Sequence, residues 1–226
     1  MLAVGAVIFD MDGVLTETSV QHFQAWKVIA DELEISIDWA FNECLKGVSR
    51  IESLNRILKH GHLDERFTET EKMDLANRKN EIYIQLIRQF DESHLFKGVR
   101  DLFEALAKAD VKVAIGSASQ NAPFLIRALG LSDLTNYIVN PTEVNKGKPA
   151  PDIFLKAMHY FGLTPEECIG VEDAEEGIKA IKSAGMFAIG IGDRALLRQA
   201  DIIFESTEAM VKRILNEGVE NIRITV

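Results

Sequence analysis

From residue 99 onward, short apolar runs alternate with amphipathic segments, and one more apolar run precedes them near the N-terminus. The runs that predict strands are 4–9, 111–115, 137–139, 168–171, 187–191 and 201–204, with 222–226 as a further candidate. The segments that predict helices are 99–107, 121–129, 152–161, 174–184 and 207–215. Such alternation is typical of a parallel sheet covered by helices on both faces. We therefore expect an α/β, Rossmann-like core.

The stretch from residue 19 to residue 90 has a different, purely helical rhythm. Apolar side chains such as Phe23 and Trp26 recur at steps of three and four residues. Residues 68–71 have the pattern of a capping box that opens a long helix. Gly61 is expected to end a helix in the left-handed conformation. We predict a helical cap domain, residues 18–91, inserted into an α/β core formed by residues 1–17 and 92–226.

Composition limits the classes of function. The 226 residues include 25 Lys and Arg against 35 Asp and Glu, a net charge of −10, and 47% are hydrophobic. A core-forming acidic chain of this kind is not expected to bind nucleic acid or an anionic membrane. Two cysteines far apart indicate a reducing compartment, and no apolar run is long enough for a signal peptide or a membrane span. We expect a cytoplasmic protein, and nothing in the sequence demands more than a monomer.

Polar side chains follow three of the predicted strands. Asp10 and Asp12 follow the first strand, Ser117 follows the second, and the pair Glu172 and Asp173 follows the strand at 168–171. Lys148 lies in the loop between the last two of these positions. Ligands of parallel α/β sheets bind outside the carboxyl ends of the strands. We expect these side chains to form one site.

Several carboxylates at one edge require either shared protons or a cation, because two unit charges ~4 Å apart repel by about 4 kcal/mol at an effective dielectric constant of about 20. Carboxylate oxygens select a hard ion such as Mg²⁺. A carboxylate nucleophile, a second carboxylate, a hydroxyl and an ammonium suit phosphoryl transfer through an aspartyl phosphate. Acids at the start of a helix can also merely favour its N-terminus. We accept that interpretation for Glu175 and Glu176 and reject it for Glu172 and Asp173.

These motifs resemble a known superfamily. Residues 10–14 (Asp-Met-Asp-Gly-Val), Ser117, the pair at 148–149 (Lys-Pro) and the pair at 172–173 (Glu-Asp) are similar to the four ordered motifs of the haloacid dehalogenase superfamily. The second aspartate points to its phosphate-processing members. Further segments resemble the β-phosphoglucomutase family, and they are 18–26, 41–42, 45–50, 78–80, 117–121, 148–154 and 169–173. The segment 46–50 (Lys-Gly-Val-Ser-Arg) is the more specific signal.

The resemblance implies an intramolecular phosphotransferase, an isomerase of carbohydrate metabolism. Its reaction interconverts β-D-glucose 1-phosphate and glucose 6-phosphate through a phosphorylated aspartate and β-glucose 1,6-bisphosphate. Asp10 would be the nucleophile and Asp12 the general acid–base. Mg²⁺ would be held by Asp10, the backbone carbonyl of Asp12, Glu172 and Asp173.

The resemblance also implies residues that bind the sugar phosphate. Ser117 and Lys148 would hold the reacting phosphoryl group, and Arg50, Ser119 and Asn121 the other phosphate, with Thr18 as a hinge. The remaining candidates for substrate binding are His22, Trp26, Lys46, Gly47, Lys79 and Ala118. The position of Trp26 on an apolar helix face favours a place in the cap core instead. Gln120 stands where the family usually has a lysine, which leaves one positive charge fewer near the second phosphate.

Two alternatives stay open. The superfamily motifs fit a Mg²⁺-dependent sugar-phosphate phosphatase equally well. A sugar-phosphate sensor without catalysis is a third reading, although the intact carboxylates speak against it.

Overall fold

The computed structural model describes residues 3–223. The chain divides into two compact units. The core unit comprises Met1–Glu17 and Phe90–Val226, and the helical unit comprises Thr18–Gln89. The helical unit thus lies in the sequence between the first strand of the core unit and all the others.

The described part of the core unit contains a six-stranded sheet in the order β3-β2-β1-β4-β5-β6. All of its neighbouring strands pair in parallel. The strands are β1 (Ala6–Phe9), β2 (Lys112–Ile115), β3 (Tyr137–Ile138), β4 (Cys168–Glu172), β5 (Phe187–Ile191) and β6 (Ile202–Phe204). The predicted parallel α/β core is confirmed. The strand order reverses direction beside β1, with β2 on one side and β4 on the other, and such a switch point is where parallel sheets bind ligands.

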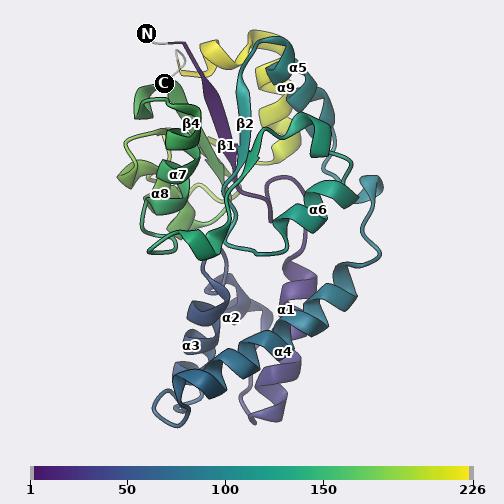
Figure 1. Ribbon diagram of the computed structural model, residues 1–226, viewed down its shortest axis with the longest axis vertical. Helices are drawn as coiled ribbons and strands as arrows, with labels where there is room; N and C mark the ends of the chain where they lie inside the picture. The colour runs from purple at the N-terminus through teal and green to yellow at the C-terminus, as the bar shows by residue number, and fades with distance from the viewer. Residues whose placement is uncertain (1–2, 224–226) are drawn as a thin grey trace. The chain divides into compact units, whose positions relative to one another are not determined.

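Helices cover both faces of this sheet (Figure 1). They are α5 (Val99–Lys108), α6 (Ala122–Ala128), α7 (Asp152–Phe161), α8 (Glu175–Ser183) and α9 (Thr207–Glu217). On one face, Ile8 of β1 shares a buried cluster with Phe154 of α7 and Ile181 of α8. On the other face, the ring of Phe9 lies 5.0 Å from that of Phe103 in α5. Alternate residues of β1 therefore face opposite helix layers, as expected for a strand buried on both faces.

Short 3-10 helices occupy several connections of the core unit and the segment after α9. They are η1 (Glu92–His94), η2 (Ser132–Leu134), η3 (Pro141–Glu143), η4 (Pro165–Glu167) and η5 (Val219–Arg223). The strand predicted for 222–226 is wrong at residues 222 and 223, which belong to η5. Residues 224–226 lie outside the described part of the chain.

The helical unit is built from α1 (Ser19–Glu32), α2 (Trp39–Glu43), α3 (Arg50–His60) and α4 (Glu69–Ile87). Their apolar faces meet in a cluster that includes Trp26, Ile29, Leu54 and Ile57. The helical rhythm of this stretch is confirmed. Among residues 3–223, no helix is both long enough and apolar enough to cross a membrane.

Two helix ends in this unit test the local predictions. The capping box of α4 is confirmed, because the Thr68 hydroxyl accepts from the Glu71 amide at 3.3 Å and the Glu71 carboxylate accepts from the Thr68 amide at 2.8 Å. The prediction that Gly61 adopts the left-handed conformation is wrong, because its φ is −83°. The next residue, His62, adopts the left-handed conformation instead, with φ 56°. A Cβ on Gly61 would lie 2.5 Å from Cγ1 of Ile35. Close packing, not backbone conformation, requires glycine there.

Candidate active site

Two carboxylates lie side by side where β1 and β4 end. Phe9 is paired with Val171 in the parallel register, so Asp10 and Glu172 follow at the same level. The Asp10 amide donates to the Val171 carbonyl at 2.9 Å and extends this pairing past the strand. Asp10 is 5% exposed and Glu172 is fully buried. Two acids thus stand together at the carboxyl edge of the sheet with almost no contact to solvent.

Lys148 joins these two carboxylates. Its Nζ atom lies 2.5 Å from Oδ1 of Asp10 and 2.5 Å from Oε1 of Glu172. The lysine comes from the loop before α7 and is 4% exposed. One buried ammonium therefore bridges two buried carboxylates, and the three groups together carry a single negative charge when all are ionised.

The electrostatics of this triad follow from its burial. Burial raises the pKa of Glu172 to about 7, with the charge of Asp10 adding to the shift and the Lys148 ammonium opposing it. Burial disfavours the charged form of Lys148, but Asp10 and Glu172 outweigh it and raise the lysine pKa above its ordinary value. The second oxygen of Glu172 accepts from the Ala174 amide at 2.8 Å. The lysine therefore stays protonated. Glu172 ionises less readily than an ordinary glutamate, and a further positive charge beside it would favour its ionised form.

Asp173 completes an acidic cluster. One carboxylate oxygen from each of Asp10, Glu172 and Asp173 lies within 4.8 Å of the others. Asp173 fits because Gly13 stands against it: a Cβ on Gly13, whose φ is +76°, would overlap the Asp173 carboxylate. Three carboxylates at this spacing offer the hard oxygen ligands that Mg²⁺ prefers. The donor set of the site therefore fits Mg²⁺.

Asp12 lies in a tight loop directly after β1. The Leu15 amide donates to the Met11 carbonyl at 2.9 Å, and the Gly13 amide donates to the Thr16 carbonyl at 2.8 Å. The hydroxyl of Thr16 ties the loop to the carbonyl of His94 at 2.8 Å. The loop holds Asp12 partly exposed, two residues after the buried Asp10. The metal role predicted for the Asp12 carbonyl stays a prediction.

The loop after β2 is shaped by its own serines. The Ser119 amide donates to the Ser117 hydroxyl at 3.1 Å, and the Asn121 amide donates to the Ser119 hydroxyl at 3.2 Å. Ser117 is buried, Ala118 is half-buried and Gln120 is exposed. A serine hydroxyl that accepts one bond can still donate its own proton. Ile115 pairs with Phe9, so Ser117 belongs to the same sheet edge as the acidic cluster.

In the helical unit, three predicted residues lie together between α1 and α4. The Lys79 ammonium lies 2.7 Å from Nδ1 of His22 and 4.9 Å from the centroid of the Trp26 ring. Tyr83 is a fourth member, with its ring 4.7 Å from the ammonium and 4.0 Å from the imidazole. Burial, and then the charge of Lys79, lowers the pKa of His22 well below its usual range. The imidazole is therefore neutral and can accept a hydrogen bond from the lysine.

Sequence reasoning missed Tyr83. Its signal was its position four residues after Lys79 on one helix, which places the two side chains on the same face. Trp26 is 2% exposed and belongs to the apolar cluster of this unit, which supports the core interpretation of that residue.

The loop from α2 to α3 carries Lys46 and Gly47, and α3 begins at Arg50. Ser49 caps α3 by accepting from the Glu52 amide at 3.2 Å. This cap places Arg50 at the first position of the helix. Lys46 pairs with Glu43 at 2.9 Å, Gly47 has φ 72°, and burial lowers the pKa of Arg50.

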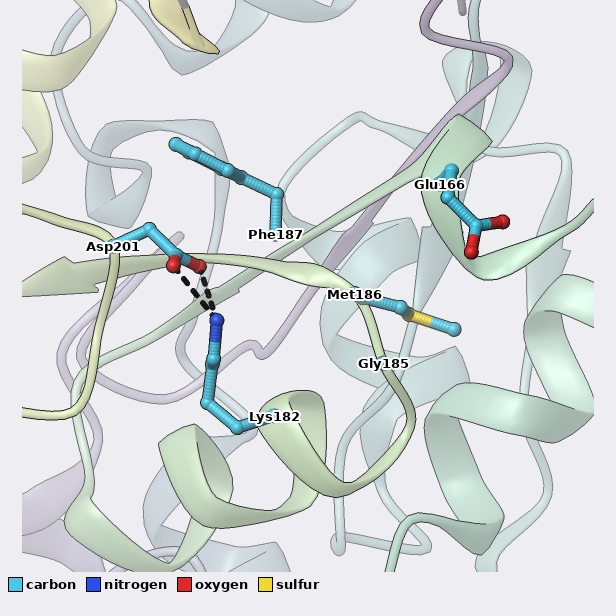
Figure 2. Close-up of a pocket in the computed structure, with 6 residues that line it drawn as sticks. All are labelled: Glu166, Lys182, Gly185, Met186, Phe187 and Asp201. Atoms are coloured by element: carbon cyan, nitrogen blue, oxygen red, sulfur yellow. Dashed lines mark hydrogen bonds and ion pairs between the residues drawn. The ribbon is translucent and has the colours of Figure 1, made fainter. Parts of the chain in front are cut away.

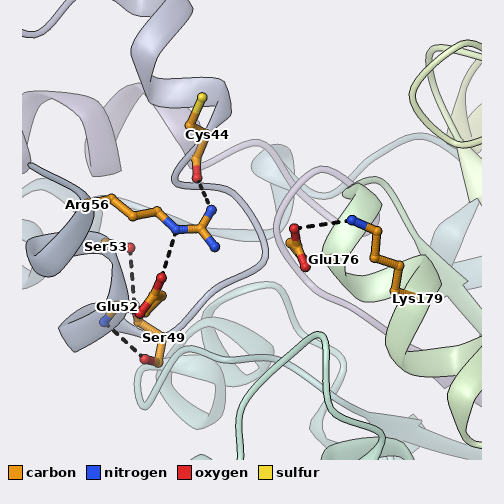
Figure 3. A network of polar contacts seen from close by, with 7 residues as sticks. All are labelled: Cys44, Ser49, Glu52, Ser53, Arg56, Glu176 and Lys179. Carbon is orange, nitrogen blue, oxygen red and sulfur yellow. Dashed lines mark hydrogen bonds and ion pairs between the residues drawn. The ribbon is translucent and has the colours of Figure 1, made fainter. Parts of the chain in front are cut away.

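Arg56 braces the same loop from α3. It lies 3.0 Å from Oε1 of Glu52 and donates to the Cys44 carbonyl at 2.5 Å, as Figure 3 shows. Thr18, the predicted hinge, is buried and directly precedes α1, at the point where the chain passes from one unit to the other. The hinge role stays a prediction.

A shallow hollow of about 290 Å³ lies elsewhere on the core unit (Figure 2). Lys182 and Asp201, which pair at 2.7 Å, line it together with Glu166, Gly185, Met186 and Phe187. Phe187 begins β5 and Asp201 precedes β6, so the hollow lies at the amino edge of the sheet. The predicted catalytic residues of the core unit stand at the carboxyl edge instead.

Comparison with known proteins agrees with this geometry. The chain matches the family model of the haloacid dehalogenase-like hydrolases over residues 4–185. It belongs to that family, whose chemistry is expected at the carboxyl edge described above. Within the family it belongs with the β-phosphoglucomutases. A β-phosphoglucomutase of Bacillus subtilis is 44% identical over 97% of both chains.

A solved structure supports the same placement. The crystal structure of a β-phosphoglucomutase from Clostridium difficile has a TM-score of 0.93, is 38% identical, and covers 99% of this chain and 100% of its own. A phosphorylated carbohydrates phosphatase of Thermotoga maritima is 30% identical over 80% of this chain and 82% of its own. Mutases and phosphatases are thus both relatives, and the mutases are the more similar in sequence.

Proposed function

We propose that this enzyme interconverts β-D-glucose 1-phosphate and glucose 6-phosphate through an aspartyl phosphate and β-glucose 1,6-bisphosphate. The observation that carries the proposal is the 44% identity with the Bacillus subtilis β-phosphoglucomutase over nearly the whole of both chains. The triad of Asp10, Lys148 and Glu172 at the sheet edge supports the chemistry.

Asp10 and Asp12 divide the chemistry between them. With Asp10 phosphorylated, the 6-hydroxyl of β-glucose 1-phosphate attacks the phosphorus, the bond to Asp10 breaks, and Asp12 takes the hydroxyl proton. The bisphosphate then presents its other phosphate, and Asp10 attacks that phosphorus. Asp12 returns the proton to the departing 1-oxygen, so glucose 6-phosphate leaves and the phosphorylated enzyme is restored. The same two carboxylates thus serve both halves of the cycle.

The neighbouring groups manage the charge of the transferred phosphoryl group. Lys148 and Ser117 would hold its oxygens by an ammonium and a hydroxyl. Mg²⁺, held by Asp10, the backbone carbonyl of Asp12, Glu172 and Asp173, would offset negative charge on that group. The positive charges of the site thus favour the transition state, which carries charge on three oxygens.

We propose that the helical unit acts as a cap that excludes water, because an aspartyl phosphate exposed to water is hydrolysed. Arg50 would bind the second phosphate of the sugar, since its planar guanidinium matches phosphate with two hydrogen bonds. Ser119 and Asn121 are the proposed partners of Arg50 in this task. The other proposed sugar-phosphate contacts are His22, Lys46, Gly47, Lys79 and Ala118, with Thr18 as the hinge. We further propose a monomer that works in the cytoplasm.

One assay tests the proposal. The enzyme is incubated with Mg²⁺, β-glucose 1-phosphate and a trace of the bisphosphate, and glucose 6-phosphate and inorganic phosphate are followed separately. The expected product is glucose 6-phosphate, with Asp10→Asn as the inactive control. Release of inorganic phosphate alone would overturn the mutase proposal.

A sugar-phosphate phosphatase is the second candidate, favoured by the similarity to the Thermotoga maritima phosphatase. A screen of phosphate esters scored by phosphate release separates the two. Turnover of several esters with no conversion of β-glucose 1-phosphate would establish the phosphatase.

A further inference from the structure

The contact between β4 and α8 is complementary residue by residue. A Cβ on Gly170 of β4 would lie 2.6 Å from Cδ1 of Ile181 in α8. One helical turn away, a Cβ on Gly177 of α8 would overlap Oε1 and Cδ of Glu172, the last residue of β4, and would lie 2.5 Å from its Cγ. Each element therefore lacks a side chain where the other has a large one.

Gly177 is not explained by the conformation of its own backbone. It lies inside α8, in the turn that follows Ala174, and does not have a positive φ. Alanine is the better helix former at such a position, because glycine loses more conformational freedom on folding. A glycine that breaks this local preference indicates a tertiary requirement. The requirement visible here is the space filled by the carboxyl group of Glu172.

That carboxyl group is enclosed by three different parts of the core unit. Lys148 contacts Oε1 at 2.5 Å, the Ala174 amide donates to Oε2 at 2.8 Å, and Gly177 lies against Cγ, Cδ and Oε1. The first two contacts are hydrogen bonds that can stretch or rotate. The third is a steric boundary, and it decides how far the carboxyl group can withdraw toward α8.

We propose that Gly177 is a positioning residue, which sets the place of the Glu172 carboxylate and thereby the affinity of the acidic cluster for Mg²⁺. The metal part rests on the proposed function of that cluster. Partners that orient metal ligands typically change metal affinity about 10- to 100-fold when they are altered. We expect Gly177→Ala to weaken Mg²⁺ binding at least about 10-fold by displacing the carboxylate.

The steric part is tested by the thermal stability of metal-free protein. Gly177→Ala is made in three backgrounds: wild type, Glu172→Gln, which keeps the shape of the side chain, and Glu172→Ala, which removes it. We expect the substitution to lower the unfolding temperature in the first two backgrounds and to leave it unchanged or raise it in the third. An equal loss in all three, or no loss in the wild type, would overturn the proposal.

Metal binding is tested by the rise in unfolding temperature as MgCl₂ alone is added to metal-stripped protein. Gly170→Ala is the matched control, because it makes the same change at the same strand–helix contact but meets Ile181 instead of the carboxylate. We expect Gly177→Ala to need at least about 10-fold more Mg²⁺ for the half-maximal rise, and Gly170→Ala to need the wild-type concentration.

An unchanged Mg²⁺ requirement in Gly177→Ala, or an equal change in Gly170→Ala, would overturn the positioning role. Both measurements are independent of turnover. A failed mutase assay would therefore overturn the proposed reaction, but the two stability measurements would still test the role of Gly177.

Discussion

Lys148 is the residue that allows two buried carboxylates to stand side by side. Without a cation between them, Asp10 and Glu172 would repel each other in a region that water hardly reaches. Its ammonium contacts both at 2.5 Å. A buried pair of this kind contributes little net stability, because desolvation offsets the attraction. What the lysine supplies is a positive charge at the carboxyl edge of the sheet, beside the carboxylate that we propose as the nucleophile.

Asp12 is predicted to affect the rate and not the fold, because it is partly exposed and lies in a loop held by backbone contacts of its neighbours. Asp12→Asn should lower kcat by about 10²- to 10⁴-fold, the usual contribution of a general acid–base. The measurement is steady-state conversion of β-glucose 1-phosphate. Glu175→Gln is the matched control, an exposed acid close by on α8 that should retain wild-type kcat. Equal losses in both variants would contradict the role of Asp12.

At the scale of elements, α1 and α4 meet through a charge enclosed by rings. Lys79 is 2% exposed and lies against Trp26 and Tyr83, with His22 as a hydrogen-bond partner. Contact of an ammonium with aromatic faces contributes about 0.5 to 2 kcal/mol, more when water is excluded. The arrangement requires a neutral imidazole, since a second positive charge beside Lys79 would repel it.

This requirement predicts a loss of stability in acid. Because burial holds the pKa of His22 below its unfolded value of about 6.5, the unfolded chain takes up the proton first as the pH falls below 6.5. The free energy of unfolding should then decrease by up to about 1.4 kcal/mol per pH unit from this group. Urea unfolding of His22→Gln between pH 7 and pH 5 should show a slope reduced by that amount. The exposed His159→Gln variant should keep the wild-type slope, and identical slopes for all three proteins would refute the prediction.

The capping box of α4 supports the helix that carries Lys79. Thr68→Ala removes the hydroxyl that accepts from the Glu71 amide, and it should lower the free energy of unfolding by about 1 kcal/mol. Thr70→Ala, an exposed change two residues further along the helix that touches no cap contact, is the control. Chemical denaturation followed by circular dichroism measures the free energy of unfolding of both variants. A loss in Thr68→Ala no larger than that in Thr70→Ala would contradict the prediction.

Local patterns in the sequence predicted most of the elements. The periodicity located α7 and β5 to the residue, since both are bounded by clear signals and packed on a regular core. The rule that parallel strands end at a common edge predicted that Asp10 and Glu172 lie together. The sequence patterns did not predict contacts that depend on how two elements are placed along each other. These contacts are Tyr83 on His22, Gly177 on Glu172, and Ile35 on Gly61. Such registers are set by packing across the fold, and one sequence does not display them.

For the whole molecule, the net charge of −10 conceals a local arrangement. Three of the acids converge within one cluster and one lysine offsets part of their charge. A cation that binds this cluster stabilises the folded state alone, because the unfolded chain does not assemble the cluster. Metal binding and the stability of the core unit are therefore linked.

This linkage predicts a response to metal removal. At a Mg²⁺ concentration 100 times the dissociation constant, the free energy of unfolding should rise by about 2.7 kcal/mol, and a chelator should abolish both this gain and the turnover. Asp173→Asn should lose most of the gain, whereas Glu176→Gln should retain it. Thermal unfolding with and without MgCl₂ provides the measurement. A full gain in Asp173→Asn would show that Mg²⁺ stabilises the protein elsewhere.

The position of β1 in the sheet has a consequence for how the chain is made. β1 leaves the ribosome before both of its partners, β2, which begins at residue 112, and β4, which begins at residue 168. The insertion of 72 residues, Thr18–Gln89, lengthens the time between the synthesis of β1 and that of its partner strands. A central, wholly apolar strand must therefore remain unpaired until β2 has been made, while the inserted helices can already pack locally. Aggregation during folding should consequently begin at residues 6–9, and Asp10, which follows this strand, reaches its place beside Glu172 only when β4 has paired with β1.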